Sequence, residues 1–385
     1  MKRVIVLGIS GSIGKQTLKI IDDNPHLFEL VGVSVNTNID FLNTCLDNHP
    51  SIEVCSVGFK EDASKVHHKK VYFGEEGLDL LASYPKADIV VNALLGYVGL
   101  RPSLVALEND KDLAIANKEA LVCGGELIKK ALEKSRGKLY PIDSEHSAIY
   151  QCLVGEDKKK IKRLLITASG GPFYDLSLDD LKNVSKEQAL KHPTWKMGNK
   201  ITIDSATLVN KGLEIIEAHY LFDVPYQKIT PVIQKESIIH SLVEFIDGSI
   251  KAQMGIPSME VPILYALNGG QRTLKEDSYL PFDQAFDLHF RPLDLNRFYA
   301  VKIAYDVGSR GGIMPLAFSV SNEVIVKAFL DDVIAFCDIV PLIDATLKKV
   351  ENRPLESLDD FKVTLKEVKD LAVHEIENWK GRAQL

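Results

Sequence analysis

Asp143 and Glu145 have the residue types and spacing of a metal site. They follow an apolar run and stand two positions apart, so on an extended chain both carboxylates would point to the same side. Like charges held that close repel each other unless a cation compensates them, and a divalent ion with oxygen ligands would do so. An exposed acidic turn is the alternative interpretation. His146 could be a third ligand, but a histidine in such a turn is more often a hydrogen-bonding partner.

A second polar stretch further along the chain combines a hydroxyl, an amide, an ammonium and a carboxylate. If it is helical, Asn210 and Glu214 lie four residues apart on one face, with Lys211 at the edge of that face. Lys211, Ser205 and Asn210 could together hold a phosphate. Glu214 could reach a metal ion, and Glu217, one turn later, is the alternative metal ligand. A solvated helix face with ordinary side-chain pairs is the alternative.

A glycine loop at residues 8–14 follows the first apolar run and opens a helical pattern. Glycines in this position let the backbone turn tightly and approach a pyrophosphate, which then meets the helix N-terminus. The spacing is GxxGxxG rather than GxGxxG, so a simple tight turn is the alternative. The next apolar run ends at residues 36–38, where an NAD enzyme would carry Asp or Glu. The missing carboxylate favours NADP, although no Arg or Lys stands there either.

Three further places carry weaker signals. Lys118 ends another apolar run, where it could hold an oxyanion or simply join a surface salt bridge. Ser169, followed by two glycines, could form an oxyanion site or only a turn. The polar stretch at residues 181–200 contains Trp195 and Met197. It fits either a mobile lid over a ligand or a loop that docks Trp195 on the core.

These side chains need a scaffold, and the first part of the chain indicates a parallel sheet. Apolar runs at residues 3–8, 30–35, 88–94, 113–116 and 138–142 alternate with helical patterns such as residues 15–23. The runs are short and unbroken by polar residues, as expected of parallel strands covered on both faces. We therefore predict an α/β protein whose N-terminal part is a doubly wound, Rossmann-like parallel sheet.

The pattern changes after residue 142. Residues 162–167 predict a strand, and residues 201–220 predict a strand, a turn and a helix. Residues 231–234, 237–246 and 249–254 predict three more strands, the last two joined at the turn pair Asp247-Gly248. We expect an antiparallel α+β domain here, then a connecting segment near residues 268–290. Helical periodicity at residues 328–339 and 341–350 predicts a small C-terminal helical bundle.

The composition excludes several classes of protein. The 46 basic and 53 acidic residues give a net charge of −7, which argues against a nucleic-acid binder. No apolar run reaches the ~20 residues that span a bilayer, and the N-terminus does not fit a signal peptide. Five cysteines, an odd number without a CxxC pair, indicate neither a disulfide framework nor a thiolate zinc site. The 385 residues suit two or three domains, and we expect a cytoplasmic enzyme.

Six ordered motifs closely resemble the 1-deoxy-D-xylulose 5-phosphate reductoisomerase family. They are LGISGSIG (7–14), ANKEALV (116–122), PIDSEHSAI (141–149), TASGGPF (167–173), HPTWKMGNK (192–200) and DSATLVNKGLE (204–214). The resemblance continues through SIIHSLVEFIDG (237–248) and SNEVIVKAFL (321–330), so it runs the full length of the chain. It implies an NADPH- and metal-dependent conversion of 1-deoxy-D-xylulose 5-phosphate to 2-C-methyl-D-erythritol 4-phosphate, in the non-mevalonate route to isoprenoids.

The resemblance also implies roles for individual residues. The cofactor-binding positions are Ser10, Gly11, Ser12, Ile13, Asn36, Thr37, Asn38, Asn117, Glu119 and Gly198. The metal ligands, usually for Mg²⁺ or Mn²⁺ and in some cases Co²⁺, are Asp143, Glu145 and Glu214. The substrate-binding positions are Lys118, Ser144, Glu145, Ser169, His192, Trp195, Ser205, Asn210, Lys211 and Glu214, of which Ser169, Ser205, Asn210 and Lys211 take the phosphate. Trp195 and Met197 match a flap. Lys118 is the expected oxyanion stabiliser, and with the three metal ligands it forms the expected catalytic set.

The same resemblance implies a domain organisation. We expect an NADPH-binding domain at residues 1–142 and a catalytic domain at residues 143–276 with a flap near residues 185–200. A connecting segment at residues 277–297 and a helical domain at residues 298–385 would follow, in a homodimer without nucleic-acid or membrane partners.

The sequence departs from the family pattern at three places. Ser10 stands where Thr is commoner, and Asn36-Thr37 stand where many members have Gly and a basic residue. Residues 234–236 replace a common His-Pro-Gln/Glu. Two rival functions remain: a plain NADP-dependent dehydrogenase of a small phosphorylated substrate, and a nucleotide-sensing regulator. A plain dehydrogenase leaves Asp143, Glu145 and Glu214 unexplained. A regulator would tolerate the loss of the metal and phosphate residues, and all of them are present.

Overall fold

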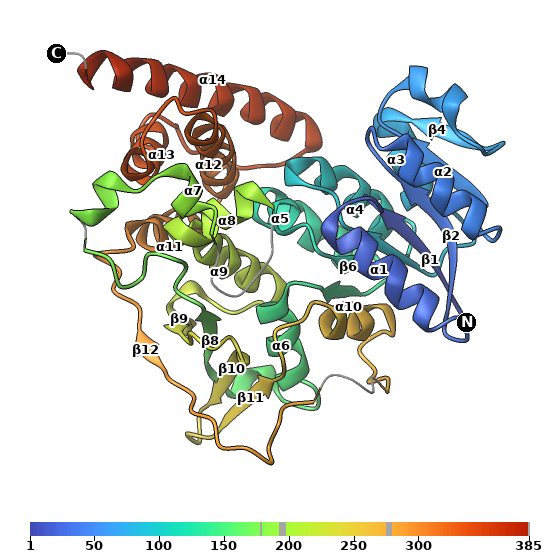
Figure 1. The fold of residues 1–385 in the computed structure, drawn as a ribbon, viewed down its shortest axis with the longest axis horizontal. Coiled ribbons are helices and arrows are strands. Elements are labelled where there is room, and N and C mark those ends of the chain that lie inside the picture. The colour runs from blue at the N-terminus through green and yellow to red at the C-terminus, as the bar shows by residue number, and fades with distance from the viewer. Residues whose placement is uncertain (178, 192–197, 275–278, 384–385) are drawn as a thin grey trace. The chain divides into compact units, whose positions relative to one another are not determined.

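The protein forms two compact units, which Figure 1 draws as a ribbon. The computed structural model describes residues 1–177, 179–191, 198–274 and 279–383. Unit 1 comprises residues 1–121, 126–147 and 258–277, and unit 2 comprises residues 122–125, 148–257 and 278–385. Within the described ranges, no helix combines the length and the apolar character needed to cross a membrane.

Unit 1 is built on a seven-stranded sheet with the order β4-β3-β2-β1-β5-β6-β7, in which all neighbours run parallel. The strands are β1 (Lys2–Leu7), β2 (Phe28–Ser34), β3 (Val54–Val57), β4 (Val71–Phe73), β5 (Ile89–Asn92), β6 (Asp112–Ile115) and β7 (Leu139–Pro141). This confirms the predicted doubly wound sheet. Five strands match predicted runs, and β3 and β4 were missed because runs of four and three residues give too little pattern to recognise.

Among the described residues of this unit, five helices connect successive strands, a sixth follows β7, and a seventh comes from the segment at residues 258–277. They are α1 (Ser12–Asp23), α2 (Ile39–Asn48), α3 (Gly74–Ala82), α4 (Leu100–Glu108), α5 (Lys118–Lys134), α6 (Ser144–Cys152) and α10 (Glu260–Leu267), with short 3₁₀ turns η1 (Lys60–Lys65) and η2 (Gly96–Gly99). The strand order reverses direction between β1 and β5, since the chain moves outward to β4 and then returns. Ligands of open α/β sheets bind beyond the strand carboxyl ends at such a reversal.

Unit 2 contains a five-stranded sheet with the order β11-β10-β8-β9-β12. Its strands are β8 (Ile161–Ala168), β9 (Ile229–Ile233), β10 (Ile239–Phe245), β11 (Ile250–Met254) and β12 (Arg291–Pro292). The strands predicted at residues 162–167, 231–234, 237–246 and 249–254 and the Asp247-Gly248 turn are confirmed, and Gly248 has the positive φ of 85° that such a turn needs. The expected antiparallel arrangement is only partly right, because β8 and β9 run parallel. Within the described residues, three α-helices lie between them in sequence, the last two of nine and fourteen residues, and such a crossover connects parallel strands.

Those two helices replace the strand predicted at the start of residues 201–220. Helix α8 (Asn199–Thr207) and helix α9 (Val209–Phe222) meet at Leu208, whose φ is +58°. The alternation of apolar and polar residues in ITID suggested a strand. Residues 202–209 are all buried, however, including the polar ones. The alternation of apolar and polar residues therefore does not separate a buried face from an exposed one, and it gives no evidence for a strand.

The rest of unit 2 is largely helical, as predicted. Its helices are α7 (Lys186–Ala189), α11 (Tyr299–Arg310), α12 (Met314–Leu330), α13 (Ile339–Leu347) and α14 (Leu358–Ala383), with 3₁₀ turns η3 (Lys158–Lys160), η4 (Asp180–Asn183), η5 (Tyr226–Lys228) and η6 (Phe336–Asp338). The helix predicted at residues 328–339 is wrong, since α12 ends at Leu330 and Asp332 takes a φ of +57°. Phe318 of α12 is fully buried and anchors the bundle core.

Candidate active site

The glycine loop of unit 1 connects β1 to α1. Gly8 has a φ of +84°, and a Cβ there would lie 2.7 Å from the carbonyl oxygen of Ala93. A Cβ on Gly14 would lie 2.3 Å from the carbonyl oxygen of Gly8. Both glycines are therefore required by the turn itself. Gly11 is the N-cap of α1, where no side chain caps the helix. The first amides of α1 are thus left for an anion, as the dinucleotide interpretation requires.

The segment after β2 lies at the same edge of the sheet. Asn36, Thr37 and Asn38 are all exposed. The Asn38 side chain caps α2 by accepting a hydrogen bond from the amide of Phe41 at 3.2 Å. The carbonyl of Asn36 accepts one from the amide of Gly58, which follows β3, at 2.8 Å. As the sequence indicated, no carboxylate stands at the end of β2.

Asn117 has a structural role at the start of α5. Its side-chain oxygen accepts from the amide of Ala120 at 2.7 Å, and its amide nitrogen donates to the carbonyls of Leu94 and Gly96, each at 2.7 Å. These bonds hold the loop after β5 against α5. Asn117 therefore fixes the position of Lys118 and Glu119, which follow it.

The lysine and the carboxylates expected at strand ends do meet in unit 1. Lys118 follows β6 and Asp143 follows β7, and the Lys118 Nζ lies 2.6 Å from an Asp143 oxygen. Lys118 is 7% exposed. An Asp143 oxygen and a Glu145 oxygen lie within 4.8 Å of each other. Ser144 donates its hydroxyl hydrogen to Glu145 at 2.7 Å.

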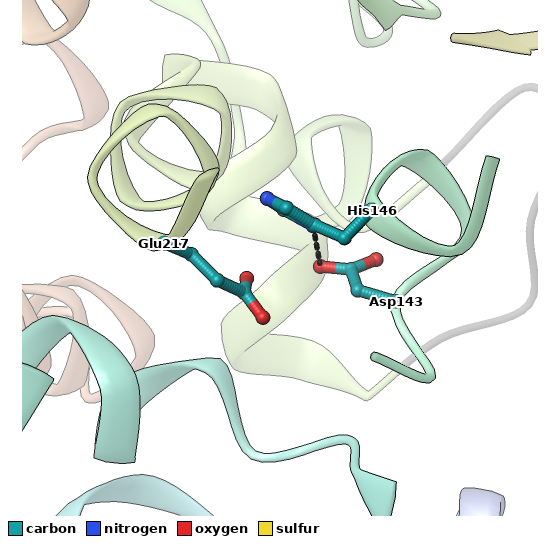
Figure 2. Close-up of side chains that lie close together, drawn as sticks. All are labelled: Asp143, His146 and Glu217. Carbon is teal, nitrogen blue, oxygen red and sulfur yellow. Dashed lines mark ion pairs between the residues drawn. The ribbon is translucent and has the colours of Figure 1, made fainter. Parts of the chain in front are cut away.

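The extended-chain geometry predicted for Asp143 and Glu145 is wrong. Helix α6 begins at Ser144, so Glu145 lies in its first turn and Asp143 just before it. The two carboxylates come together at a helix N-terminus, where the helix dipole favours negative charge. Figure 2 shows the fully buried His146 facing Asp143, with the Nδ1 atom 3.8 Å from an Asp143 oxygen. Glu217, drawn in the same figure, comes from α9 of unit 2.

In unit 2, the polar face of α9 is organised around a buried ion pair. Lys211 and Glu214 are 3% and 1% exposed and form an ion pair with each other. The Lys211 ammonium also donates to the carbonyl of Thr167 at the end of β8. The Asn210 side chain donates to the other carboxylate oxygen of Glu214. The predicted shared face of Asn210 and Glu214 is confirmed, but it is a buried network rather than a solvated face.

The two predicted phosphate serines come from different elements that touch. Ser169 follows β8, and Ser205 lies in the last turn of α8. Gly171, with a φ of +67°, approaches α8 so closely that a Cβ would lie 2.7 Å from the Ser205 carbonyl oxygen. The loop after β8 is therefore packed on the end of α8. Ser169, Ser205, Asn210 and Lys211 thus belong to adjoining elements of one unit.

Sequence reasoning missed Asp204, which anchors α8. This carboxylate is 2% exposed, accepts from Lys200 at 2.7 Å and accepts from Asn322 of α12 at 2.8 Å. The i, i+4 spacing of Lys200 and Asp204 was the available signal, but it appears only once the segment is known to be helical. His192, Trp195 and Met197 lie outside the described residues, and the exposed Gly198 caps α8.

A doubly wound sheet followed by an α+β unit is an architecture of nucleotide-dependent oxidoreductases, and this is the class that the fold and the two clusters indicate. Residues 4–125 match the family 1-deoxy-D-xylulose 5-phosphate reductoisomerase, and residues 139–222 and 254–371 match two C-terminal domains of the same enzyme. The chain belongs to the 1-deoxy-D-xylulose 5-phosphate reductoisomerase family.

Individual relatives and solved structures agree with this assignment. A 1-deoxy-D-xylulose 5-phosphate reductoisomerase of Bacillus cereus (strain AH187) is 48% identical over 90% of this chain and 92% of its own length. One from Macrococcus caseolyticus is 46% identical over 89% of this chain and 92% of its own. The enzyme from Zymomonas mobilis in complex with NADPH superposes with a TM-score of 0.92 at 34% identity, covering 98% and 99% of the two chains. A DOX-P reductoisomerase in complex with NADPH, fosmidomycin and magnesium gives a TM-score of 0.91 at 33% identity, covering 99% of each.

Proposed function

We propose that the protein converts 1-deoxy-D-xylulose 5-phosphate to 2-C-methyl-D-erythritol 4-phosphate, with NADPH and a divalent cation, in isoprenoid precursor biosynthesis. The observation that carries this proposal is the cluster in unit 1, where Lys118 pairs with Asp143 and Glu145 lies beside them. A plain dehydrogenase needs no second carboxylate at that point. Family membership supplies the substrate.

The proposed metal ligands are Asp143, Glu145 and Glu214. All three are carboxylates, which are the ligands that Mg²⁺ and Mn²⁺ prefer. Asp143 and Glu145 already converge at the N-terminus of α6. Glu214 is buried with the ammonium of Lys211 and the amide of Asn210 as partners, and these contacts orient its carboxylate. A bound divalent cation would supply Lewis acidity and a template for two substrate oxygens.

The proposed substrate site adds groups that hold the phosphate and the reacting oxygens. The ammonium of Lys211, the hydroxyls of Ser169 and Ser205 and the amide of Asn210 are suited to a phosphate. Lys118 places an ammonium beside the acidic pair, where it stabilises an oxyanion. Ser144, held on Glu145, and the flap residues His192 and Trp195 complete the proposed set.

The proposed cofactor site lies along the carboxyl edge of the unit 1 sheet. The amides at the start of α1 take the pyrophosphate, and the segment after β2 takes the adenosine ribose. NADPH supplies the hydride. The proposed contacts are Ser10, Gly11, Ser12, Ile13, Asn36, Thr37, Asn38, Asn117, Glu119 and Gly198. Asn117 also holds the loop after β5 in place, through its hydrogen bonds to the carbonyls of Leu94 and Gly96.

We propose an NADPH-binding domain at residues 1–142 and a catalytic domain at residues 143–276, with the flap at residues 185–200. A connecting segment at residues 277–297 and a helical domain at residues 298–385 follow. We place the enzyme in the cytoplasm, because all five of its cysteines are free thiols and cytoplasmic proteins keep thiols reduced.

We also propose a homodimer. Tyr279, Phe282 and Phe290 of unit 2 are 71%, 75% and 46% exposed, and a group of exposed aromatic side chains is typical of an interface. Sedimentation equilibrium at micromolar concentration should give twice the mass of one chain. The mass of a single chain would contradict the dimer.

Metal removal tests the proposed function most directly. Oxidation of NADPH with 1-deoxy-D-xylulose 5-phosphate should stop in EDTA and return when Mg²⁺ or Mn²⁺ is added in excess. A bound cation would offset the negative charge that develops on the substrate oxygens, so we expect its removal to lower turnover by at least about 1000-fold. Unchanged turnover in EDTA would instead favour the plain dehydrogenase. Specific NADPH binding without conversion of this substrate would favour a regulator.

A further inference from the structure

The segment after β2, residues 36–38, carries no positive charge where NADPH would place its 2′-phosphate. NADPH differs from NADH by a 2′-phosphate, which carries about −1.5 to −2 charges at neutral pH. Residues 36–38 would face that group with amides and a hydroxyl only. Positive charge from elsewhere in unit 1 would strengthen a preference for NADPH, and Lys15 and Lys60 come from elements that contact this segment or its helix.

Lys15 comes from α1, one residue beyond the glycine loop. Its ammonium lies 5.2 Å from the centre of the Phe41 ring, in the first turn of α2. The amide of that same Phe41 is the donor to the Asn38 side chain. Lys15 therefore stands over the helix turn that Asn38 caps, on the α1 side of the exposed segment.

Lys60 follows β3, which pairs with β2 on the side away from β1. It begins η1, directly after the loop that leaves β3. Gly58 in this loop donates its amide to the carbonyl of Asn36, and a Cβ on Gly58 would lie 2.0 Å from the Asn36 side-chain oxygen. The loop is therefore packed on Asn36 itself, and Lys60 is two residues further on. Its ammonium lies 5.9 Å from the centre of the exposed Phe73 ring.

Both ammonium groups rest on aromatic rings rather than on carboxylates. Within the described part of the chain, neither Lys15 nor Lys60 forms an ion pair. Other lysines of the same two elements do: Lys19 lies 2.7 Å from Glu260, and Lys65 lies 2.7 Å from Asp62. An ammonium that rests on an aromatic ring is not neutralised by a carboxylate. Both lysine side chains are exposed, so each can rotate toward a bound anion.

We infer that Lys15 and Lys60 hold the 2′-phosphate of NADPH from two sides, in place of a basic residue at position 37. The two lysines are specificity residues, because they act on the one group that distinguishes the cofactors. Asp40 directly precedes Phe41, on which Lys15 rests, and Glu61 directly follows Lys60, so both carboxylates reduce the local positive potential. We therefore expect a preference for NADPH of about 100-fold rather than many thousands. This inference rests on the proposed use of NADPH.

The test compares Lys15→Gln, Lys60→Gln and the double variant in the full chain. Dissociation constants for NADPH and NADH are measured by fluorescence titration, and 2′,5′-ADP and 5′-ADP serve as competitors that need no turnover. Each single change should weaken NADPH by about fivefold to tenfold, and the double change by about 50-fold. NADH and 5′-ADP should change by less than about threefold. The salt dependence of NADPH binding should also flatten in the double variant, because fewer charges are screened.

Lys19→Gln and Lys65→Gln are the matched controls, since they remove a lysine from the same elements but one that is already paired. They should leave the ratio of the two dissociation constants unchanged. An unchanged ratio in the double variant, or equal binding of NADPH and NADH by the natural protein, would overturn the inference and leave the proposed rearrangement standing. A protein that prefers NADPH through these lysines but does not convert the sugar phosphate would support the inference and defeat the proposed function.

Discussion

Glu145→Gln should abolish turnover and leave NADPH binding nearly intact. The change replaces one charged oxygen by an amide of the same size, which still accepts the hydrogen bond from Ser144. The fold of α6 should therefore survive. Loss of one carboxylate ligand lowers the affinity for the divalent cation and its compensation of substrate charge, so kcat should fall by at least about 1000-fold. The cofactor binds on the glycine loop, so its dissociation constant should change by less than about threefold.

The measurement combines steady-state kinetics with titration of Mn²⁺ and of NADPH. Glu108→Gln, which removes an exposed carboxylate from the end of α4, is the control for the loss of negative charge. It should keep the activity and the Mn²⁺ affinity of the natural protein. Activity of Glu145→Gln near that of the natural protein in Mg²⁺ would remove Glu145 from the metal site.

The acidic pair shows where sequence reasoning succeeds. Lys118 and Asp143 were placed at strand ends by their apolar runs, and carboxyl ends of adjacent parallel strands lie at one edge of a sheet. Their ion pair follows from the order of β6 and β7. The direction of the Glu145 side chain could not be predicted, because the sequence was interpreted as an extended chain at this point. A helix begins at Ser144, so side chains follow helical spacing there and do not alternate every two residues.

The network on α9 shows where it fails. The sequence placed Asn210, Lys211 and Glu214 on one helix face, but their burial depends on what covers that face. The carbonyl that holds Lys211 belongs to Thr167, more than forty residues away, and α8 was expected to be a strand. Asp204 went unnoticed for the same reason. Contacts between distant segments depend on packing, and local periodicity carries no information about them.

Lys211→Met should lower both stability and activity, and the two effects can be separated. The change removes the ammonium that forms an ion pair with the carboxylate of Glu214, which is 1% exposed. Breaking a buried pair in this way costs about 3–5 kcal/mol of the free energy of unfolding. The lost ammonium also removes the strongest group proposed for the substrate phosphate, so KM should rise by about 100-fold. Denaturant unfolding and substrate kinetics measure the two effects.

The double variant Lys211→Met, Glu214→Leu distinguishes a structural pair from a functional one. Replacing both members of the pair by apolar side chains removes both buried charges, and buried pairs replaced in this way are often as stable as the original. We expect the free energy of unfolding to return to within about 1 kcal/mol of the natural value, while turnover stays below detection because the phosphate and metal groups are both gone. Lys349→Met, which breaks the ion pair with the buried Glu375 of α14, is the control. It should lower stability without changing kcat or KM of the folded protein. If the stabilised double variant regained turnover, Lys211 and Glu214 would be packing residues, and the phosphate and the metal ion would have to be held by other side chains.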